Sequence, residues 1–485
     1  MLFYSPRFFI FLFVLLLVFA VRTGHERKKH LLAVASCLFY AGWDFRYLAL
    51  LLLVSFIDYW CAARIQASER QADRKRYLTF SIVSNLTILG YFKYTNFFLA
   101  NLNGFLPASA QFPHLDILLP AGISFYTFKS MSYTIDVFRR EIAPCTNVMD
   151  YVTFVTFFPD LIAGPIVRAS VFLPQMTRPI GPTRTGLRDG VSLFLLGLTK
   201  KMVVADTLAR AADPVFKAPG GYATSSLWMG VLAYTIQIYC DFSGYSDMAI
   251  GTAKMIGYDL PENFNMPYLA RNPSDFWRRW HITLSQWLRD YLYIPLGGNR
   301  RGPVRTYVNI FLTMLLGGLW HGASWNFVLW GGLHGVALAV HRAWVSYRLP
   351  VPPALMARVL MFVFATLCWI PFRASTTSDS VTIIKGLFGM PEGNIVFLPV
   401  MLFVMVAIVI AGHAVMLAVE SARGAAVLGS LFRFVDAEYV TGRVSGRYVA
   451  LGASTVPGSF LLAAWALLVL SLAAFTSQPF IYFQF

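Results

Sequence analysis

Charged residues are scarce in this chain, and their scarcity decides its class. Of the 485 residues, 57% are hydrophobic and only 13% are charged, whereas a soluble globular protein usually carries about 25% charged residues. Apolar runs recur along the sequence, among them residues 8–21, 47–60, 118–137 and 397–416. Because a bilayer-spanning helix needs about 20 mostly apolar residues, we expect an all-α, polytopic membrane protein with about ten to twelve transmembrane helices.

The sequence signatures of several enzyme classes are also missing. The five cysteines are scattered, and no Cys/His group has the spacing of a zinc site. We find neither a glycine-rich phosphate-binding signature nor a Gly-x-Ser-x-Gly nucleophile elbow. These absences argue against a metalloenzyme, a nucleotide-binding domain and a serine hydrolase, so we expect no metal site and no bound cofactor.

No Ser/Gly-rich linker interrupts the chain, so we expect a single membrane domain with three blocks. Residues 1–115 and 346–485 consist mainly of apolar helices, and residues 116–345 form a core block denser in Gly, Pro, Trp, His and paired charges. Inside a membrane, irregular backbone is tolerated only where protein or a water-filled cavity surrounds it. The core block is therefore predicted to line a cavity with interfacial or re-entrant helices.

The net charge of +16 is explained by orientation in the membrane. Lys and Arg collect in cytoplasmic loops, and they are frequent in residues 22–30 and 63–77 but almost missing from residues 99–117. This alternation places the two basic loops in the cytoplasm, and the N-terminus and residues 99–117 outside. We expect membrane lipids, and not nucleic acid, as the partners of the basic surface.

Residues 276–291 predict a basic amphipathic helix. Its apolar side chains share one arc: Trp277, Trp280, Leu284, Trp287, Leu288 and Tyr291. Arg278, Arg279 and Arg289 lie on the opposite side, with His281 at the border. This pattern is typical of an interfacial helix whose aromatic residues face acyl chains. The arginines would bind either anionic lipid alone or a donor that carries phosphates, such as an acyl-coenzyme A.

His321 has unusual neighbours for a residue in an apolar segment. They are three glycines and two tryptophans, Gly317, Gly318, Trp320, Gly322 and Trp325. The glycines allow another backbone or a substrate to approach closely, and the tryptophans supply apolar bulk. A neutral imidazole in such a pocket suits a general base near neutral pH. The alternative is a hydrogen-bonded structural histidine.

Asp241, Ser243 and Asp247 form a polar patch beside an apolar stretch. Ionisable groups at membrane depth are expensive and are functional candidates by default. The patch would either position a histidine or the acceptor, or hold the fold through a hydrogen-bond network. The sequence leaves both possibilities open.

Together these residues resemble the membrane-bound O-acyltransferases, in the bacterial branch that acetylates alginate and cellulose and, more distantly, adds D-alanine to teichoic acid. The matching segments are residues 39–43, 89–94, 122–128, 158–165, 200–206, 237–247, 276–300, 315–330, 369–373 and 479–483. Their order and spacing match over nearly the whole chain. Lys129, where relatives often carry Gln, and Pro371 depart from the pattern.

The resemblance implies a ring of tilted helices around a central funnel in the bacterial inner membrane. The histidine that the family requires for transfer corresponds to His321, and the one in its Arg-Arg-Trp-His segment corresponds to His281. Family members move an acyl group from a cytoplasmic donor to an acceptor on or beyond the other side. The expected donor is acetyl-coenzyme A, and the expected partners are periplasmic acetyltransferase or carrier proteins.

The expected reaction is acetylation of alginate or a similar secreted polysaccharide, cellulose being the alternative acceptor. His321 would remove the proton from an acceptor hydroxyl, which attacks the thioester. Two other functions remain open. A transporter would pass a polar substrate through the funnel, and a scaffold would only hold polysaccharide-synthesis partners together.

Overall fold

The computed structural model describes residues 2–21, 24–389, 392–395, 400–419, 437–442, 446–452, 455–473 and 481. They pack as two compact units. The first unit comprises Met1–Gly190 and Ala249–Leu260, and the second comprises Val191–Met248 and Pro261–Phe485. The breaks at residues 190 and 248 fall inside the predicted core block.

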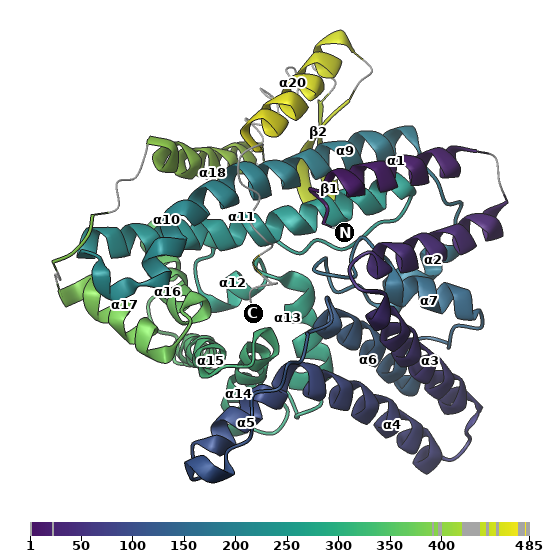
Figure 1. Cartoon of the computed structure of the whole chain (residues 1–485), viewed down its shortest axis with the longest axis horizontal. Coiled ribbons are helices and arrows are strands. Elements are labelled where there is room, and N and C mark those ends of the chain that lie inside the picture. The colour runs from purple at the N-terminus through teal and green to yellow at the C-terminus, as the bar shows by residue number, and fades with distance from the viewer. Residues whose placement is uncertain are drawn as a thin grey trace. The chain divides into compact units, whose positions relative to one another are not determined.

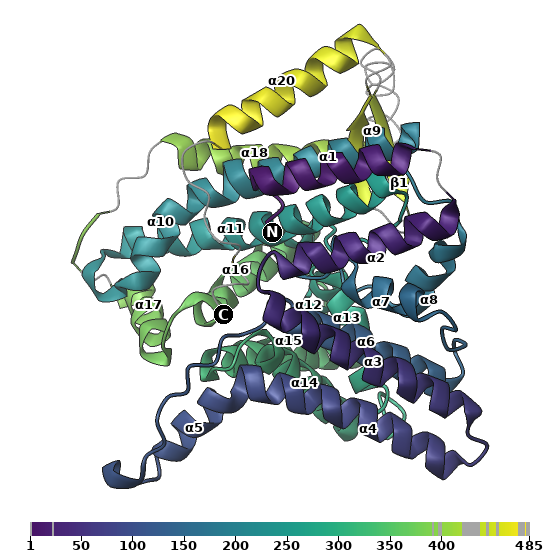
Figure 2. The same cartoon turned by 45° about the vertical axis from the view of Figure 1, so that its right-hand side comes forward.

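The first unit is built mainly from helices (Figures 1 and 2). They are α1 (Pro6–Ala20), α2 (His25–Ala41), α3 (Phe45–Ala67), α4 (Gln71–Leu89), α5 (Thr95–Asn103), α6 (Ile123–Arg139), α7 (Val148–Thr156) and α8 (Ala169–Phe172). Local sequence signals mark several beginnings. Ser5 caps α1 by accepting from the N–H of Phe8, and Asp44 caps α3 by accepting from the N–H of Arg46.

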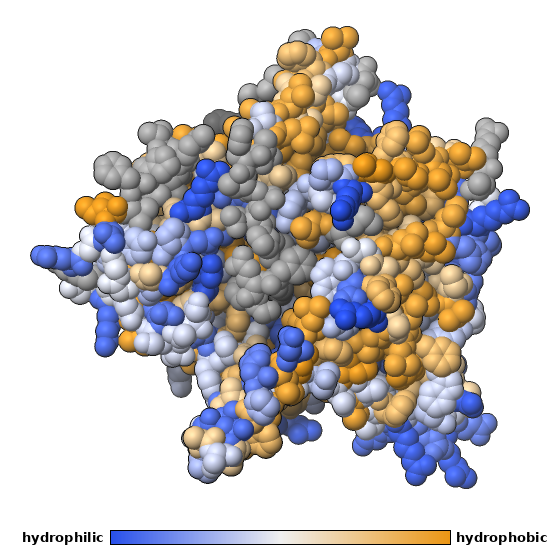
Figure 3. Space-filling model, in the orientation of Figure 1, coloured by the Kyte–Doolittle hydropathy of each residue, from blue (hydrophilic) through white to orange (hydrophobic). Residues whose placement is uncertain are grey.

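The outer surfaces of α1, α2 and α3 are strongly apolar, as the orange area of Figure 3 shows. Large hydrophobic side chains are exposed on each helix, for example Phe13 on α1, Leu38 on α2 and Phe56 on α3. An extended exposed apolar surface of this kind is unusual for a soluble protein. Blue, hydrophilic residues gather instead where α3 passes into α4, which is the predicted basic loop (Figure 3).

The interior of the first unit holds a buried ion pair. The ammonium group of Lys129 on α6 lies 2.8 and 2.9 Å from the two carboxylate oxygens of Asp160, and both side chains are fully buried. A second buried polar cluster surrounds Asp58, which accepts hydrogen bonds from Ser81 and Asn85. Lys129, a departure from the family pattern, is therefore held by a charged partner inside this unit.

The second unit is also mainly helical. Its helices are α10 (Asp206–Lys217), α12 (Pro273–Trp277), α13 (Ile282–Leu288), α14 (Pro303–His321), α15 (Trp325–Ser346), α16 (Ala354–Arg373), α17 (Thr377–Gly389), α18 (Val400–Val419) and α20 (Val456–Ala473). Helices α9 (Arg184–Leu198) and α11 (Thr224–Ile256) contribute residues to both units. Two π-helical turns, Thr199–Ala205 and Arg289–Tyr293, interrupt the regular helices of this unit.

The expectation of an all-α fold is confirmed apart from one short hairpin. Strands β1 (Ala437–Gly442) and β2 (Gly446–Leu451) pair antiparallel in the second unit, with Ala437 opposite Leu451. They fall in a polar stretch that interrupts the apolar C-terminal block. The matching segment 479–483 lies outside the described residues apart from Ile481.

Two helices in the described part of the chain are long and apolar enough to cross a membrane by themselves, α3 and α16. Shorter apolar helices include α1 and parts of α18 and α20. The finding agrees with a membrane protein, and the larger number of spanning helices remains a prediction.

Candidate functional site

The segment 276–291 is not one continuous helix, contrary to the prediction. Helix α12 ends at Trp277 and α13 begins at Ile282, while His281 between them adopts a left-handed backbone with φ of 42°. Hydrogen bonds from another loop stabilise this break. The N–H of Ile282 donates to the Asn263 carbonyl over 2.9 Å, and the N–H of Asn265 donates to the Arg279 carbonyl over 2.8 Å.

The apolar side of this segment faces protein, which corrects the prediction that it faces acyl chains. Trp277, Trp280 and Trp287 are each at most 6% exposed. The ring of Trp280 lies 4.7 Å from that of Trp369 on α16, and Trp277 lies 5.7 Å from Trp330 on α15. Burial in protein and burial in lipid produce the same helical periodicity, and here the aromatic residues build an internal core.

His321 is the last residue of α14, and glycines bring α15 close to it. A Cβ atom on Gly318 would collide with the carbonyl oxygen of Phe327, and one on Gly331 would collide with that of Met314. A Cβ atom on Gly322 would overlap the Phe327 ring. The prediction that these glycines permit close backbone approach is confirmed. Helices α14 and α15 lie side by side in both ribbon views (Figures 1 and 2).

Aromatic rings surround the imidazole of His321, which is 3% exposed. Trp320 and Trp330 each have their ring centroid 5.0 Å from it, and Phe372 on α16 lies at 5.4 Å. Trp325 begins α15 and is 59% exposed. Of the two tryptophans predicted to supply apolar bulk, Trp320 packs against the imidazole, and Trp330 and Phe372 join it from more distant parts of the chain.

His281 lies beside His321, with 6.3 Å between the ring centroids. It is fully buried, and the Phe242 ring packs edge-on against it at 4.7 Å. Its Nδ1 atom lies 3.1 Å from the Oδ1 atom of Asn263. Burial lowers the pKa of His281 to about 3, so this imidazole is neutral at physiological pH.

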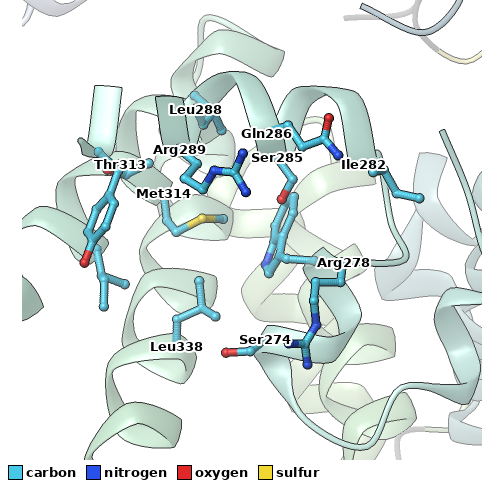
Figure 4. A pocket seen from close by; sticks show the side chains of 13 residues that line it. Ser274, Arg278, Ile282, Ser285, Gln286, Leu288, Arg289, Thr313, Met314 and Leu338 are labelled. Atoms are coloured by element: carbon cyan, nitrogen blue, oxygen red, sulfur yellow. The ribbon is translucent and has the colours of Figure 1, made fainter. Parts of the chain in front are cut away.

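A pocket opens between α12, α13, α14 and α15 (Figure 4), and Ile282, which directly follows His281 in the chain, is among its lining residues. Its volume is about 570 Å³, within the usual range for small-molecule sites. The lining residues are Ser274, Trp277, Arg278, Ile282, Ser285, Gln286, Leu288, Arg289, Tyr293, Ile310, Thr313, Met314 and Leu338. Arg289 reaches across one part of the pocket, and Arg278 lies near Ser274 (Figure 4).

The three predicted donor-binding arginines separate into two groups. Arg278 and Arg289 line the pocket and are exposed, although Arg289 also pairs with Asp290. Arg279 is directed elsewhere: its Nε atom donates to Asp275 over 2.9 Å and its Nη1 atom to the Asn265 carbonyl. Two of the three arginines therefore line the same pocket. The third, Arg279, stabilises the local structure through its hydrogen bonds.

The predicted supporting aspartates are both paired with lysines of the π-helical turn. Asp241 lies 2.6 Å from Lys201, and Asp247 lies 2.6 Å from Lys200. Asp241 also accepts from the backbone N–H of Ile481, and Ser243 between them is buried. The sequence left two roles open for these residues. The contacts favour the second of them, a hydrogen-bond network that holds the fold.

Sequence reasoning missed Asn263, Trp330 and Phe372 as members of this site. Each lies at least eight residues from the histidine that it contacts, so no local periodicity connects them. The signal for Asn263 was present as a cluster of Asn and Pro between α11 and α12, which indicates irregular backbone with side-chain hydrogen bonding.

Comparison with known proteins places the site in context. Residues 37–376 match the model of the membrane-bound O-acyltransferase family. The chain is 45% identical over 379 residues to the probable alginate O-acetylase AlgI of Azotobacter vinelandii, covering 76% of this chain and 75% of that protein. It is 39% identical over 424 residues to the peptidoglycan O-acetyltransferase of Helicobacter pylori, covering 80% of each.

A more distant similarity links the chain to the teichoic acid D-alanyltransferase of Bacillus subtilis. The identity is 28% over 247 residues, which is 47% of this chain and 60% of that protein. The segments that carry His281 and His321 both fall within the region that the family model matches.

Proposed function

The chain belongs to the membrane-bound O-acyltransferase family and is an O-acyltransferase, and from this premise we propose that it acetylates a secreted polysaccharide. The proposed donor is acetyl-coenzyme A from the cytoplasm. Alginate is the acceptor that the names of several relatives support, at 42 to 45% identity over about three quarters of the chain. Cellulose and other polysaccharides are the alternative acceptors.

One observation carries this proposal: the arginine-lined pocket lies on the same helices as the paired histidines. Thr313 and Met314 line the pocket, and His321 ends the same helix α14. Eight residues of helix separate Thr313 from His321, a rise of about 12 Å. A donor with its phosphates near Arg278 and Arg289 could therefore extend its acylated arm along α14 toward the histidines.

The arginines suit the phosphate-bearing end of such a donor. A guanidinium group forms paired hydrogen bonds with phosphate oxygens and remains charged at every physiological pH. The apolar lining of the pocket, including Leu288, Met314 and Leu338, suits the less polar remainder of the donor molecule. A lipid anchor would not need a hollow of this volume beside the two arginines.

His321 is the proposed general base. It takes the proton from an acceptor hydroxyl as the oxygen attacks the thioester carbonyl, and the C–S bond then breaks. The protonated imidazole returns that proton to the leaving thiolate, so the products are an acetyl ester and coenzyme A. Neutral His281, close beside it, would support the acceptor hydroxyl through hydrogen bonding.

The proposed setting is the bacterial inner membrane, with a periplasmic N-terminus and about ten to twelve transmembrane helices. The alternation of basic and non-basic loops supports this orientation. In the proposed orientation the arginine-lined pocket faces the cytoplasm, where acetyl-coenzyme A is found. Periplasmic acetyltransferase or carrier proteins are the proposed receivers of the acetyl group.

Membrane vesicles of defined orientation test the proposal. Coenzyme A does not cross membranes, so acetyl-labelled donor added outside reaches only the outward face. We expect everted vesicles, which expose the cytoplasmic face, to form labelled ester and release free thiol, whereas right-side-out vesicles do neither. Ester formation without thiol release, or equal labelling in both orientations, would overturn the proposed donor and its side.

A further inference from the structure

Asn263 makes a set of contacts that fixes the orientation of its side-chain amide. The residue is 1% exposed. Its Oδ1 atom receives the backbone N–H of Thr283 at 3.4 Å and the Thr283 hydroxyl at 2.9 Å, while its Nδ2 atom donates to Ser246 on α11 over 3.2 Å. A backbone N–H can only donate, so the amide atom that it faces is the oxygen.

This orientation determines which nitrogen of His281 carries the proton. The Oδ1 atom of Asn263 also lies 3.1 Å from Nδ1 of His281. A carbonyl oxygen only accepts hydrogen bonds, so Nδ1 must be the protonated nitrogen of the neutral ring. In that tautomer Nε2 keeps its lone pair and is able to accept a hydrogen bond or a proton.

We infer that Asn263 is a positioning residue for acyl transfer: it holds His281 in the Nδ1–H tautomer and so presents Nε2 as an acceptor at the reaction site. The inference rests on the proposed participation of His281 in the reaction. It assigns to an uncharged amide the role of orienting the imidazole, which in many enzymes falls to a carboxylate.

The backbone beside Asn263 reinforces this arrangement. The left-handed conformation of His281 is costly for a residue with a side chain, and it persists only where the surroundings hold it in place. The Asn263 carbonyl accepts from Ile282, directly after His281. One residue thus fixes both the main chain next to the imidazole and the ring nitrogen itself.

Aromatic rings also pack around His281. They are Phe242 from α11, Phe264 from the 263–265 loop and Trp320 from α14, and the titratable His321 lies beside them. A carboxylate placed at position 263 would lie at hydrogen-bond distance from the His281 ring, as the Asn263 oxygen does. This makes the pH dependence of activity a sensitive measure of the contact.

The first test compares Asn263→Asp with Asn263→Leu in purified protein at several pH values. The carboxylate introduced by Asn263→Asp would favour the protonated ring, so activity should fall as the pH is lowered through 8 to 6 and recover at higher pH. Asn263→Leu should lower kcat at every pH, by about tenfold or more, with the donor KM little changed. Thr283→Val is the matched control, since it removes one bond to the same oxygen and should keep the wild-type pH profile.

An Asn263→Asp profile identical to that of the wild type would overturn the inference. Nitrogen NMR of histidine-labelled wild-type protein, with His281→Gln to assign the signal, provides a test that needs no Asn263 variant. A protonated Nδ1 is expected, and a protonated Nε2 would overturn the inference. Full activity of His281→Gln would instead contradict the proposed role of His281 itself. Failure of the Asn263 inference and failure of the role of His281 are therefore distinguishable.

Discussion

The imidazole rings of His281 and His321 lie 6.3 Å apart and are inclined by 58° to each other. One ring comes from the break between α12 and α13, and the other from the end of α14. Two local features therefore place the two imidazoles among the same aromatic side chains: the left-handed backbone of His281 and the glycines near His321.

Replacing Arg278 and Arg289 together with glutamine should weaken donor binding. Both side chains line the pocket, and exposed charge pairs are each worth up to about 1 kcal/mol, so the loss of both should raise the donor KM by up to about 30-fold. Turnover at saturating donor should change less. The effect should shrink at high salt, because counterions screen exposed charges.

Arg279→Gln provides the control for that experiment. Arg279 bonds Asp275 and the Asn265 carbonyl, so its loss should lower thermal stability and leave the donor KM unchanged. If the Arg278/Arg289 double variant shows an unchanged KM but poorer membrane insertion, the two arginines anchor lipid and do not bind donor.

The buried pair of Lys129 and Asp160 should behave as a structural element. Lys129→Gln leaves the Asp160 carboxylate buried without its cation, which costs about 3–5 kcal/mol. Thermal unfolding in detergent should therefore occur at a clearly lower temperature. Adding Asp160→Asn should restore most of the loss, and activity per folded molecule should stay near that of the wild type. A specific loss of turnover in stable Lys129→Gln protein would instead indicate a role in the reaction.

Membrane orientation is accessible to cysteine labelling. After replacement of the five native cysteines, single cysteines at positions 105–112 should react with an impermeant reagent added outside intact cells. Cysteines at positions 70–76 should react only after the membrane is permeabilised. Phe105 and Arg76 are both exposed and are suitable labelling sites, whereas Arg74 in the same loop is buried and should be avoided. Labelling of the 70–76 loop from outside would reverse the proposed topology.

The sequence predicted the class of protein and drew attention to two histidines that lie side by side in the structure, because those signals are local. Low charge content, long apolar runs and the glycines around His321 can each be recognised without knowledge of the fold. The close approach of α14 and α15 at Gly318 then followed from the lack of a side chain. The family resemblance rested on the order and spacing of such local motifs, and it was correct.

The sequence misled where tertiary contacts override periodicity. A regular 3.6-residue pattern predicted an unbroken helix through His281, but hydrogen bonds from the 263–265 loop replace the helical ones there. The pairing of Lys129 with Asp160 joins residues 31 positions apart, and no local pattern reveals it. The aromatic side of the helix was assigned to lipid because hydrophobicity does not distinguish a lipid neighbour from Trp330 or Trp369.

Acetyl transfer by a His321→Ala variant tests the central claim most directly. The measurement is the acetyl ester formed in everted membrane vesicles from labelled acetyl-coenzyme A, normalised to correctly inserted protein. General bases contribute about 10²- to 10⁴-fold to rates, so we predict a loss of ester and free thiol of at least about 100-fold. Ester formation near the wild-type rate in folded His321→Ala protein would contradict the account and favour a transporter or a scaffold.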